Sequence, residues 1–288
     1  MYESFFRLAE LPFSLSPDPR FLWLSETHQE GLAALTYGLT NRKGFVLLTG
    51  EVGSGKTTLL RGVLERLGED LPETAMVMNT VGLGALDLLK LVSVEFRLLT
   101  AQEATATPRT AADYILLLNS FLLDKMRKGR SAALIVDEAQ NLGLEALEQV
   151  RLLSNLETHS EKLLQIVLTG QPELRERLAD PRLRQLRQRI AIEHHVQPLS
   201  RDEVGRYLRH RIEIAGGKFE RLFFADAEDL FAEFSGGCPR LVNLLADRAL
   251  LASYSRGLRP VPPRLLELKA LELGRALPGA ARPMLRPG

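Results

Sequence analysis

Residues 44–58 of the chain read Gly-Phe-Val-Leu-Leu-Thr-Gly-Glu-Val-Gly-Ser-Gly-Lys-Thr-Thr. The apolar residues that open this stretch predict a buried strand, and the apolar residues at helical spacing that follow it predict a helix. Between the two lies Gly50-x-x-x-x-Gly55-Lys56-Thr57, the pattern of a phosphate-binding loop (P-loop). The order of strand, loop and helix is the context that such a match requires.

Each residue type in this loop has a physical reason to be there. Glycines let the backbone turn so that successive N–H groups face one anion, and the following helix adds its positive N-terminal end. Lys56 can reach the β- and γ-phosphates of a nucleotide, and the Thr57 hydroxyl can ligate Mg²⁺. A chance glycine turn is the weaker alternative, because a strand and a helix flank the loop. We therefore predict that ATP is bound by Gly50, Glu51, Val52, Gly53, Ser54, Gly55, Lys56, Thr57 and Thr58.

The composition is that of an ordinary globular protein. The chain has 288 residues, of which 45% are hydrophobic and 25% charged, and its formal net charge is +1. This charge neither favours nor excludes binding to nucleic acid. The single cysteine, Cys238, rules out an intramolecular disulfide. No apolar run approaches 18 residues and the N-terminal residues are unlike a signal peptide, so we expect a cytoplasmic protein.

Short apolar segments alternate with helical patterns over most of the chain. This alternation predicts an α/β domain with a parallel five-stranded sheet and flanking helices over residues 28–198. We expect the stretch 100–108 to be a loop. The expected strands are 44–49, 74–79, 132–136, 163–169 and 190–196, and the expected helices of this domain include 26–42, 83–98 and 109–128.

The two ends of the chain differ from this central part. Residues 1–27 are rich in proline and aromatic residues, and we expect an irregular segment that packs on the core domain. After Pro198 only helical patterns remain, at 201–215, 225–235 and 239–254, which predict a small all-helical lid domain over 199–256. Residues 257–288 are expected to form a C-terminal helix and a disordered tail.

A second candidate element of the site is the sequence Ala133-Leu-Ile-Val-Asp137-Glu138. Its apolar residues predict a strand buried on both faces, and parallel sheets bind ligands at the carboxyl ends of their strands. We predict that Asp137 holds Mg²⁺ through water and that Glu138 polarises the water that attacks the γ-phosphate. Solvated charges at the end of a strand are the alternative. We expect strand 74–79 to lie between the P-loop strand and this strand in the sheet.

Several further motifs accompany these two. Together they make the chain similar to AAA+ ATPases and, from residue 2 to about 255, to the general secretion pathway protein A (ExeA-type) ATPases, including relatives found beside exosortase and exopolysaccharide genes. The motifs are Phe5-Phe6-x-Leu8, Pro12-Phe13, Pro17-Asp-Pro-Arg-Phe-Leu22, the P-loop, Asp137-Glu-Ala-Gln-Asn-Leu142, Glu148-x-x-Arg-Leu-Leu-Ser-Asn-Leu-Glu-Thr158, Gly170-Gln-Pro-Glu-Leu174, Arg184-Gln-Leu-Arg-Gln-Arg-Ile190 and Pro239-Arg-Leu-x-Asn243.

The resemblance implies roles for four further positions. Asn79 would gate the catalytic glutamate, although a turn-forming role at the strand end is an equal alternative. Sensor 1 would be Thr169, which we favour slightly, or Gln171. Arg189, with Arg187 as the alternate, would be a finger that reaches the γ-phosphate bound by a neighbouring subunit. Arg240 would be sensor 2 of the helical lid. A surface salt bridge is the alternative for both arginine roles.

The resemblance also implies a Mg²⁺-dependent ATPase that works as a homo-oligomer, with ATP between the sheet domain and the lid. Its output would be the assembly or remodelling of a secretion or exopolysaccharide-export complex, with the ATPase held peripherally at the inner membrane by that partner. Secretion-type members often continue into a membrane-spanning segment and a peptidoglycan-binding domain. Because this sequence ends at Gly288 without them, we expect it to belong to the free-standing cytoplasmic subset.

Two rival functions remain open at this point. DNA-bound ATPases that select targets for transposition also resemble this family, and residues 175–189 contain six arginines that could contact DNA phosphates. A solvated, partly salt-bridged face is the alternative explanation for this arginine run. A nucleotide-dependent scaffold with negligible turnover is the second rival, and the presence of Glu138 argues against it. The arginines are Arg175, Arg177, Arg182, Arg184, Arg187 and Arg189.

Overall fold

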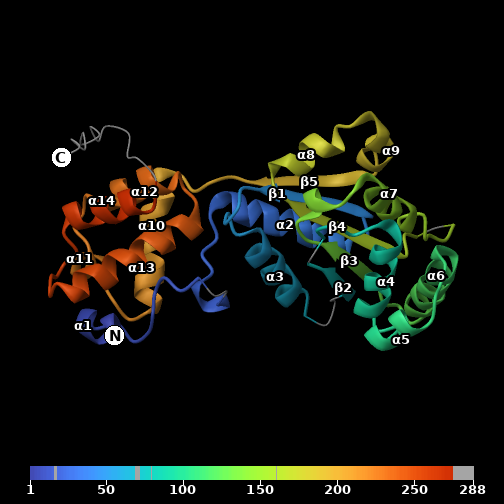
Figure 1. Cartoon of the computed structure of the whole chain (residues 1–288), viewed down its shortest axis with the longest axis horizontal. Helices are drawn as coiled ribbons and strands as arrows, with labels where there is room; N and C mark the ends of the chain where they lie inside the picture. The colour runs from blue at the N-terminus through green and yellow to red at the C-terminus, as the bar shows by residue number, and fades with distance from the viewer. Residues whose placement is uncertain (16–17, 69–71, 79, 160, 275–288) are drawn as a thin grey trace, which may run out of the picture. The chain divides into compact units, whose positions relative to one another are not determined.

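The computed structural model describes residues 1–15, 18–68, 72–78, 80–159 and 161–274. The chain divides into two compact units, which are considered separately below. The α/β unit consists of Glu26–Glu51 and Lys56–Val196. The helical unit consists of Met1–Ser25, Val52–Gly55 and the chain from Gln197 onward. Figure 1 shows the elements of both units in order along the chain.

The α/β unit is built on a parallel sheet of five strands in the order β2-β3-β4-β1-β5. The three central strands are buried along their whole length, whereas both edge strands are partly exposed. Every neighbouring pair is parallel, as the alternation of strands and helices predicts. The strands are β1 (Phe45–Gly50), β2 (Glu73–Val77), β3 (Ala132–Val136), β4 (Leu164–Gly170) and β5 (Ile190–Val196).

One expectation about the sheet is wrong. The strand between the P-loop strand β1 and the Asp137 strand β3 is β4, whereas β2 pairs only with β3 at the edge of the sheet. The physical reason is burial: β4 carries seven buried residues, while β2 begins with half-exposed Glu73 and Thr74. A strand with polar residues at its start suits an edge, where one side meets solvent.

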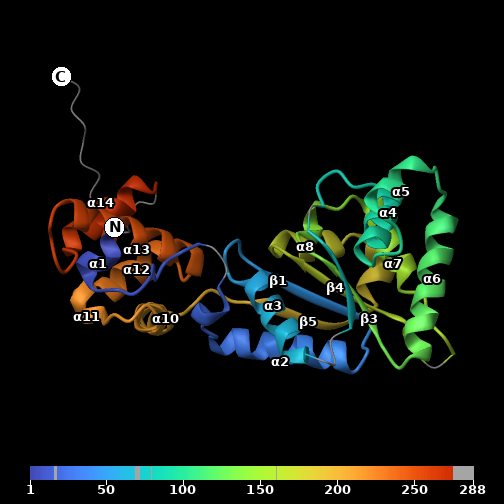
Figure 2. The same cartoon turned by 90° about the horizontal axis from the view of Figure 1, so that it is seen from below.

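Helices cover both faces of this sheet (Figure 2). Phe45 and Leu47 of β1 belong to the core shared with α4, α6 and α7, and the alternation of a strand sends Val46 and Leu48 to the opposite face. There α2 approaches closely, because a Cβ on its Gly38 would lie 2.6 Å from Val46. The helices are α2 (Glu26–Thr40), α3 (Lys56–Leu67), α4 (Ala85–Glu95), α5 (Ala101–Ala106), α6 (Ala111–Arg127), α7 (Leu144–Leu153), α8 (Pro172–Leu178) and α9 (Arg184–Arg187).

The stretch 100–108, expected as a loop, contains the short helix α5. Thr100 caps this helix by accepting a hydrogen bond from the Glu103 N–H, and the Glu103 carboxylate accepts one from the Thr100 N–H in return. Such a reciprocal pair satisfies two backbone donors at once and can start a helix without an apolar face. The Thr-x-x-Glu pattern was therefore the signal for a helix at this place.

The helical unit has a hydrophobic core of its own. Its main helices alternate buried and exposed faces, as the periodic patterns after Pro198 predict. The boundaries of a lid domain at 199–256 and of a disordered tail stay predictions, and residues 275–288 lie outside the described residues. The elements are α1 (Tyr2–Phe6), the 3₁₀ turn η1 (Pro19–Phe21), α10 (Arg201–Ile214), α11 (Phe219–Leu222), α12 (Ala227–Ser235), α13 (Pro239–Ser255) and α14 (Pro263–Glu272).

The N-terminal segment is grouped with this helical unit, and its packing on the sheet domain stays a prediction. Its aromatic residues are buried in the same core as α10 and α13. The Tyr2 hydroxyl donates a 2.5 Å hydrogen bond to Asp247, and the Arg259 guanidinium donates to the Phe5 carbonyl at 2.8 Å. Apolar residues in an irregular segment indicate burial, but they do not identify the surface that covers them.

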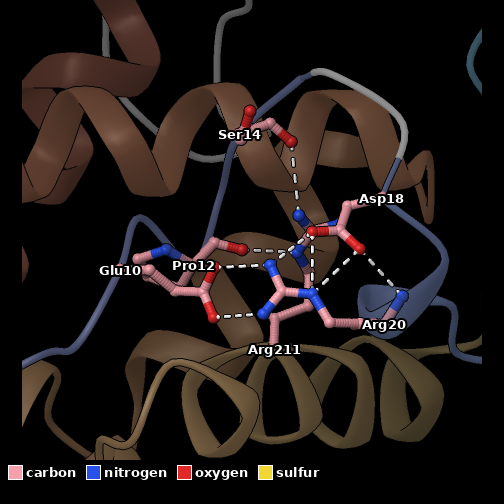
Figure 3. Close-up of polar contacts among 6 residues, drawn as sticks. All are labelled: Glu10, Pro12, Ser14, Asp18, Arg20 and Arg211. Carbon is pink, nitrogen blue, oxygen red and sulfur yellow. Dashed lines mark hydrogen bonds and ion pairs between the residues drawn. The ribbon is translucent and has the colours of Figure 1, made fainter.

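A buried arginine fastens this segment (Figure 3). Arg211 of α10 is 7% exposed and donates to the backbone oxygens of Pro12 at 2.6 Å and Ser14 at 3.2 Å. Nearby, Arg20 makes a two-pronged pair with the Glu10 carboxylate at 2.8 and 2.7 Å and also contacts Asp18 at 2.6 Å. Two backbone carbonyls of this segment therefore obtain a charged donor from Arg211, while Arg20 links the side chains of Glu10 and Asp18.

Among the described residues, no helix combines the length and the apolar character needed to cross a membrane.

Candidate nucleotide-binding site

The P-loop joins the end of β1 to the start of α3. Gly53 and Gly55 have φ angles of +80° and +98°, a region that residues with a side chain rarely adopt. The Lys56 ammonium donates to the backbone oxygens of Gly50 at 2.7 Å and Glu51 at 2.9 Å, which holds it beside the end of β1. The first N–H groups of α3 have no carbonyl partner within the helix. Glycines with positive φ angles before the N-terminus of a helix are the features by which P-loops bind phosphate.

Asp137 lies at the carboxyl end of β3, where its carboxylate links three parts of the α/β unit. It is 5% exposed. Oδ2 accepts a hydrogen bond from the Thr57 hydroxyl of α3 at 3.2 Å, and Oδ1 accepts one from the Thr169 hydroxyl of β4. Oδ1 also accepts from the Glu138 N–H at 3.0 Å. The structure therefore brings Thr57, Asp137 and Thr169 into direct contact, as the two sequence motifs predict for the first two.

Glu138 follows in an unusual backbone conformation. Its φ and ψ angles are 51° and 39°, which is left-handed and costs a residue with a side chain roughly 1–2 kcal/mol. One carboxylate oxygen, Oε2, accepts hydrogen bonds from the amides of Gln140 and, at 3.0 Å, Gln171. Burial raises the pKa of Glu138, but these two hydrogen bonds and the charge of Lys56 outweigh it and hold the pKa below its usual value. The carboxylate is therefore ionised at neutral pH.

Two residues at this site were missed by the reasoning from sequence. Thr80, 1% exposed, donates to the Glu138 carbonyl at 2.8 Å and thereby holds the backbone of the left-handed residue. Gln140 contacts the Glu138 side chain directly. Their places in the sequence, after the expected strand 74–79 and two residues after Glu138, did not indicate these contacts, which depend on the turn at Glu138. Asn79, the expected gating residue, lies outside the described residues.

Both candidates for sensor 1 lie beside the carboxylate pair, but on different partners. Thr169, the favoured candidate, touches Asp137, while Gln171 touches Glu138. The cause is the position of β4 next to β3: the last residues of β4 and the first residue after it lie along the end of β3. The two candidates for sensor 1 therefore differ in the carboxylate to which each donates a hydrogen bond.

The candidate arginines are placed as follows. Arg187 ends α9 and is exposed, whereas Arg189 is half-buried and donates to the Ser154 hydroxyl. Arg240 is the second residue of α13 in the helical unit. Within that unit, which includes Val52–Gly55, a Cβ on Gly53 would lie 2.6 Å from the Cβ of Arg240. A larger residue at position 53 is thus excluded by space as well as by its φ angle.

Most arginines of the run after β4 make ion pairs or hydrogen bonds within the chain. Arg175 pairs with Glu193, Arg182 pairs with Asp180 at 2.6 Å, and Arg177 donates to the carbonyls of Gln140 and Leu142. With Arg189 on Ser154, four of the six arginines have an identified contact. In the part of the chain that the structure describes, Arg184 and Arg187 have no ion-pair partner. This pattern favours a salt-bridged face over a continuous phosphate track.

Comparison with known proteins gives one family and one close relative in sequence. Residues 39–178 match the family model described as an AAA domain. General secretion pathway protein A from Aeromonas hydrophila is 45% identical over 273 residues, which are 95% of this chain and 48% of that protein. The chain therefore spans about half the length of the curated relative that it matches.

Solved structures agree in fold at much lower sequence identity. Cdc6p from Pyrobaculum aerophilum is 19% identical with a TM-score of 0.70, covering 91% of this chain and 70% of that one. The ORC2 protein of Aeropyrum pernix is 15% identical with a TM-score of 0.65 and the same coverage. RuvB from Thermotoga maritima, a Holliday junction branch migration motor, is 17% identical with a TM-score of 0.55, covering 86% of this chain and 69% of that one. At these identities the similarity establishes the fold alone.

Proposed function

Because this chain is an AAA+ P-loop protein that resembles general secretion pathway protein A, we propose that it is an oligomeric, Mg²⁺-dependent ATPase that assembles or remodels a secretion or exopolysaccharide-export complex. One observation carries the enzymatic part. The P-loop residue Thr57 and the strand-end residue Asp137 are in hydrogen-bond contact at 3.2 Å, and Glu138 follows directly in the chain. Phosphate binding, metal binding and water activation thereby meet at one end of the sheet.

The donor atoms fit a magnesium ion. The Thr57 hydroxyl and the Asp137 carboxylate offer only oxygen, the ligand that Mg²⁺ prefers, and Mg²⁺ commonly keeps several waters and takes few protein ligands. Thr57 would bind the ion directly and Asp137 through water. When bound, the ion neutralises charge on the phosphate oxygens. Lys56 would supply a second positive charge at the β- and γ-phosphates.

Glu138 would act on the attacking water. Its carboxylate is ionised, as a group that accepts a proton must be, and it is held by two amides near Lys56. Thr169, through Asp137, would serve as sensor 1, with Gln171 as the alternate. Asn79 as the gate on Glu138 and Arg240 as sensor 2 complete the proposed catalytic set.

An arginine from a neighbouring copy would complete the reaction. We keep both Arg187 and Arg189 for this role, and the structure adds an argument between them. Arg189 donates to Ser154 of its own chain, whereas the side chain of Arg187 is exposed and can extend toward another molecule. The exposure supports Arg187. An arginine supplied in this way accelerates phosphoryl transfer by roughly 10³- to 10⁵-fold, so assembly would control activity.

The biological partner rests on the relative. At 45% identity over 95% of this chain, general secretion pathway protein A supports a link to secretion, and the proposed site of action is the cytoplasmic face of the inner membrane, reached through a partner complex. In this proposal the energy of ATP hydrolysis drives the assembly or remodelling of the partner complex.

The experiment is a phosphate-release assay on the purified chain with ATP and Mg²⁺. We expect turnover that disappears with EDTA and in the Asp137→Asn variant, which retains the shape of the side chain but loses its charge. Size-exclusion chromatography with light scattering on the same samples should detect an oligomer with ATP. Turnover that is equal in wild type and Asp137→Asn, or that persists without Mg²⁺, would refute the proposal.

A further inference from the structure

We propose that Gln140 and Gln171 form an amide clamp that holds one oxygen of the Glu138 carboxylate and leaves the other for water, which makes both glutamines positioning residues. The inference rests on the proposed ATP hydrolysis, because it concerns the group assigned to activate the water. It starts from an asymmetry in the hydrogen bonds of one carboxylate.

The asymmetry lies between the two oxygens of Glu138. Oε2 accepts from the side-chain amides of Gln140 and Gln171, which come from different parts of the chain. Among the described residues no hydrogen bond reaches Oε1. A carboxylate oxygen with two donors has its usual acceptor sites filled, whereas its partner can still accept a proton. Oε1 is therefore the oxygen that the geometry assigns to the attacking water.

The orientation of the Gln140 amide is fixed at both of its ends. Its nitrogen donates to Glu138, and its oxygen accepts the backbone N–H of Gln171 at 3.2 Å. The backbone carbonyl of Gln140 in turn accepts from the Arg177 guanidinium of α8. These contacts tie the turn after β3 to α8 and to the residue that caps its start, so the amide cannot rotate without breaking a hydrogen bond.

Gly170 provides the space for this arrangement. A Cβ built on Gly170 would lie 2.6 Å from the Gln140 side-chain oxygen and 2.7 Å from a methyl group of Leu174. No side chain fits there without displacing Gln140 or the packed leucine. The absence of a side chain at Gly170 therefore leaves the space in which the Gln140 amide reaches Gln171.

The backbone of Glu138 also requires such support. The left-handed conformation is unfavourable for glutamate and persists only where neighbours fix it. Thr80 holds the backbone carbonyl, and the two amides hold the side chain. An unclamped carboxylate would be free to populate several rotamers, of which only some place Oε1 toward a water.

The test replaces each glutamine by methionine, which keeps the length and volume of the side chain but removes the amide. We would measure kcat for phosphate release and the dissociation constant for ATP in Gln140→Met, Gln171→Met and the double variant, with Gln171→Glu as a second substitution in case methionine disturbs folding. Gln102→Met, on the exposed face of α5, is the matched control.

We expect each methionine variant to lose about 10- to 100-fold in kcat, less than the roughly 10²- to 10⁴-fold that the proton acceptor itself contributes, with ATP affinity unchanged within about twofold. The losses should not multiply in the double variant, because either change frees the carboxylate. A loss of ATP affinity larger than the loss of kcat would overturn the inference, since it would mean that the glutamines contact the nucleotide. Unchanged kcat in both variants would overturn it as well.

A second measurement does not depend on hydrolysis. We would introduce Glu138→Ala both into wild-type protein and into the double methionine variant and measure the shift in melting temperature in each. The two shifts should differ, because the clamp couples these residues. Equal shifts would contradict the clamp. If wild-type protein releases no phosphate from ATP, the proposed function fails, and this thermal cycle still decides whether the amides hold the carboxylate.

Discussion

The Thr57 hydroxyl lies 3.2 Å from Oδ2 of Asp137, although 80 positions separate the two residues in the chain. Thr57 lies in α3, which follows β1, and Asp137 follows β3; these two strands are not neighbours, because β4 lies between them. Thr169 of that intervening strand donates to the other oxygen of Asp137. One carboxylate therefore connects the P-loop helix to two strand ends, and the expected chemistry of each group can be tested separately.

The first prediction concerns nucleotide binding. Lys56→Ala removes the charge that faces the β- and γ-phosphates, and we expect ATP affinity to fall by about 10- to 100-fold, the worth of a charge-assisted hydrogen bond of about 1.5–3 kcal/mol. Isothermal titration calorimetry with ATP measures the loss. Lys128→Ala, which removes an exposed lysine paired with Asp124, is the control. Affinities that fall equally in both variants would contradict the assigned role of Lys56.

The second prediction concerns the neighbour's arginine. We expect Arg187→Ala or Arg189→Ala to bind ATP normally and to hydrolyse it roughly 10³-fold more slowly, because the charge that stabilises the transition state is lost. Wild-type turnover per subunit should rise with protein concentration. The decisive control mixes each arginine variant with Lys56→Ala protein, since a finger acting between subunits would restore activity in the mixed oligomer. No recovery, together with turnover independent of concentration, would indicate that neither arginine acts in trans.

The third prediction concerns the N-terminal segment. Arg211→Ala leaves the carbonyls of Pro12 and Ser14 without their arginine donor, and we expect the unfolding free energy of the helical unit to fall by about 3 kcal/mol. Trp23, the single tryptophan, packs edge-on against Tyr207 and its fluorescence reports the docking of this segment.

The control for this prediction lies on the same helix. Arg201 makes an exposed ion pair with Asp229, and such pairs contribute only about 0–1 kcal/mol. Urea titrations followed by Trp23 fluorescence should therefore separate Arg211→Ala clearly from Arg201→Ala. Equal midpoints in the two variants would mean that Arg211 does not fasten the segment.

The fourth prediction separates ATPases of secretion from DNA-bound regulators. Binding to DNA phosphates releases counterions, so the logarithm of affinity falls with the logarithm of salt by about 0.9 per phosphate contacted. We expect weak binding to duplex DNA with a slope shallower than about −2, because Arg175, Arg177 and Arg182 are occupied within the chain. Fluorescence anisotropy with ATP-loaded Glu138→Gln protein measures the slope.

A steep slope would reverse this conclusion if it depends on the arginine run. The variant Arg182→Glu with Arg184→Glu lies outside the candidate finger and should leave ATP affinity intact. Tight, salt-sensitive DNA binding in the parent protein that is lost in this variant would replace secretion by regulation of transposition as the proposed function.

Much of the fold follows from local sequence patterns. All five strands and most of the long helices were predicted from apolar runs and periodicity, because each element must bury its own face; α7 was not among the expected helices. The order of strands in the sheet was not predicted, since β2 and β4 compete for the place beside β1 and only their relative burial decides it. The shared core of residues 1–25 with α10 and α13 could not be predicted for the same reason, because apolar residues demand burial but do not choose the partner.

The candidate site shows the same division. Gly55, Lys56, Thr57 and Asp137 were recognised because each lies in a short motif with a chemical reason for its residue types. The contacts from Thr80 and Gln140 could not be derived in this way, since they depend on the left-handed turn at Glu138 and on the position of the β4 end. Motif spacing predicts which residues are candidates for the chemistry. The turn at Glu138 determines which neighbouring residues contact them.

The most direct test of the account is the behaviour of Glu138→Gln in one pair of measurements, ATP affinity and the rate of phosphate release. The substitution keeps the size of the side chain and removes its negative charge and with it the ability to accept a proton. We predict ATP affinity within about twofold of wild type and phosphate release slower by about 10²- to 10⁴-fold, the contribution of a general base. Phosphate release at the wild-type rate in Glu138→Gln would contradict the assignment of Glu138 and, with it, the proposed mechanism.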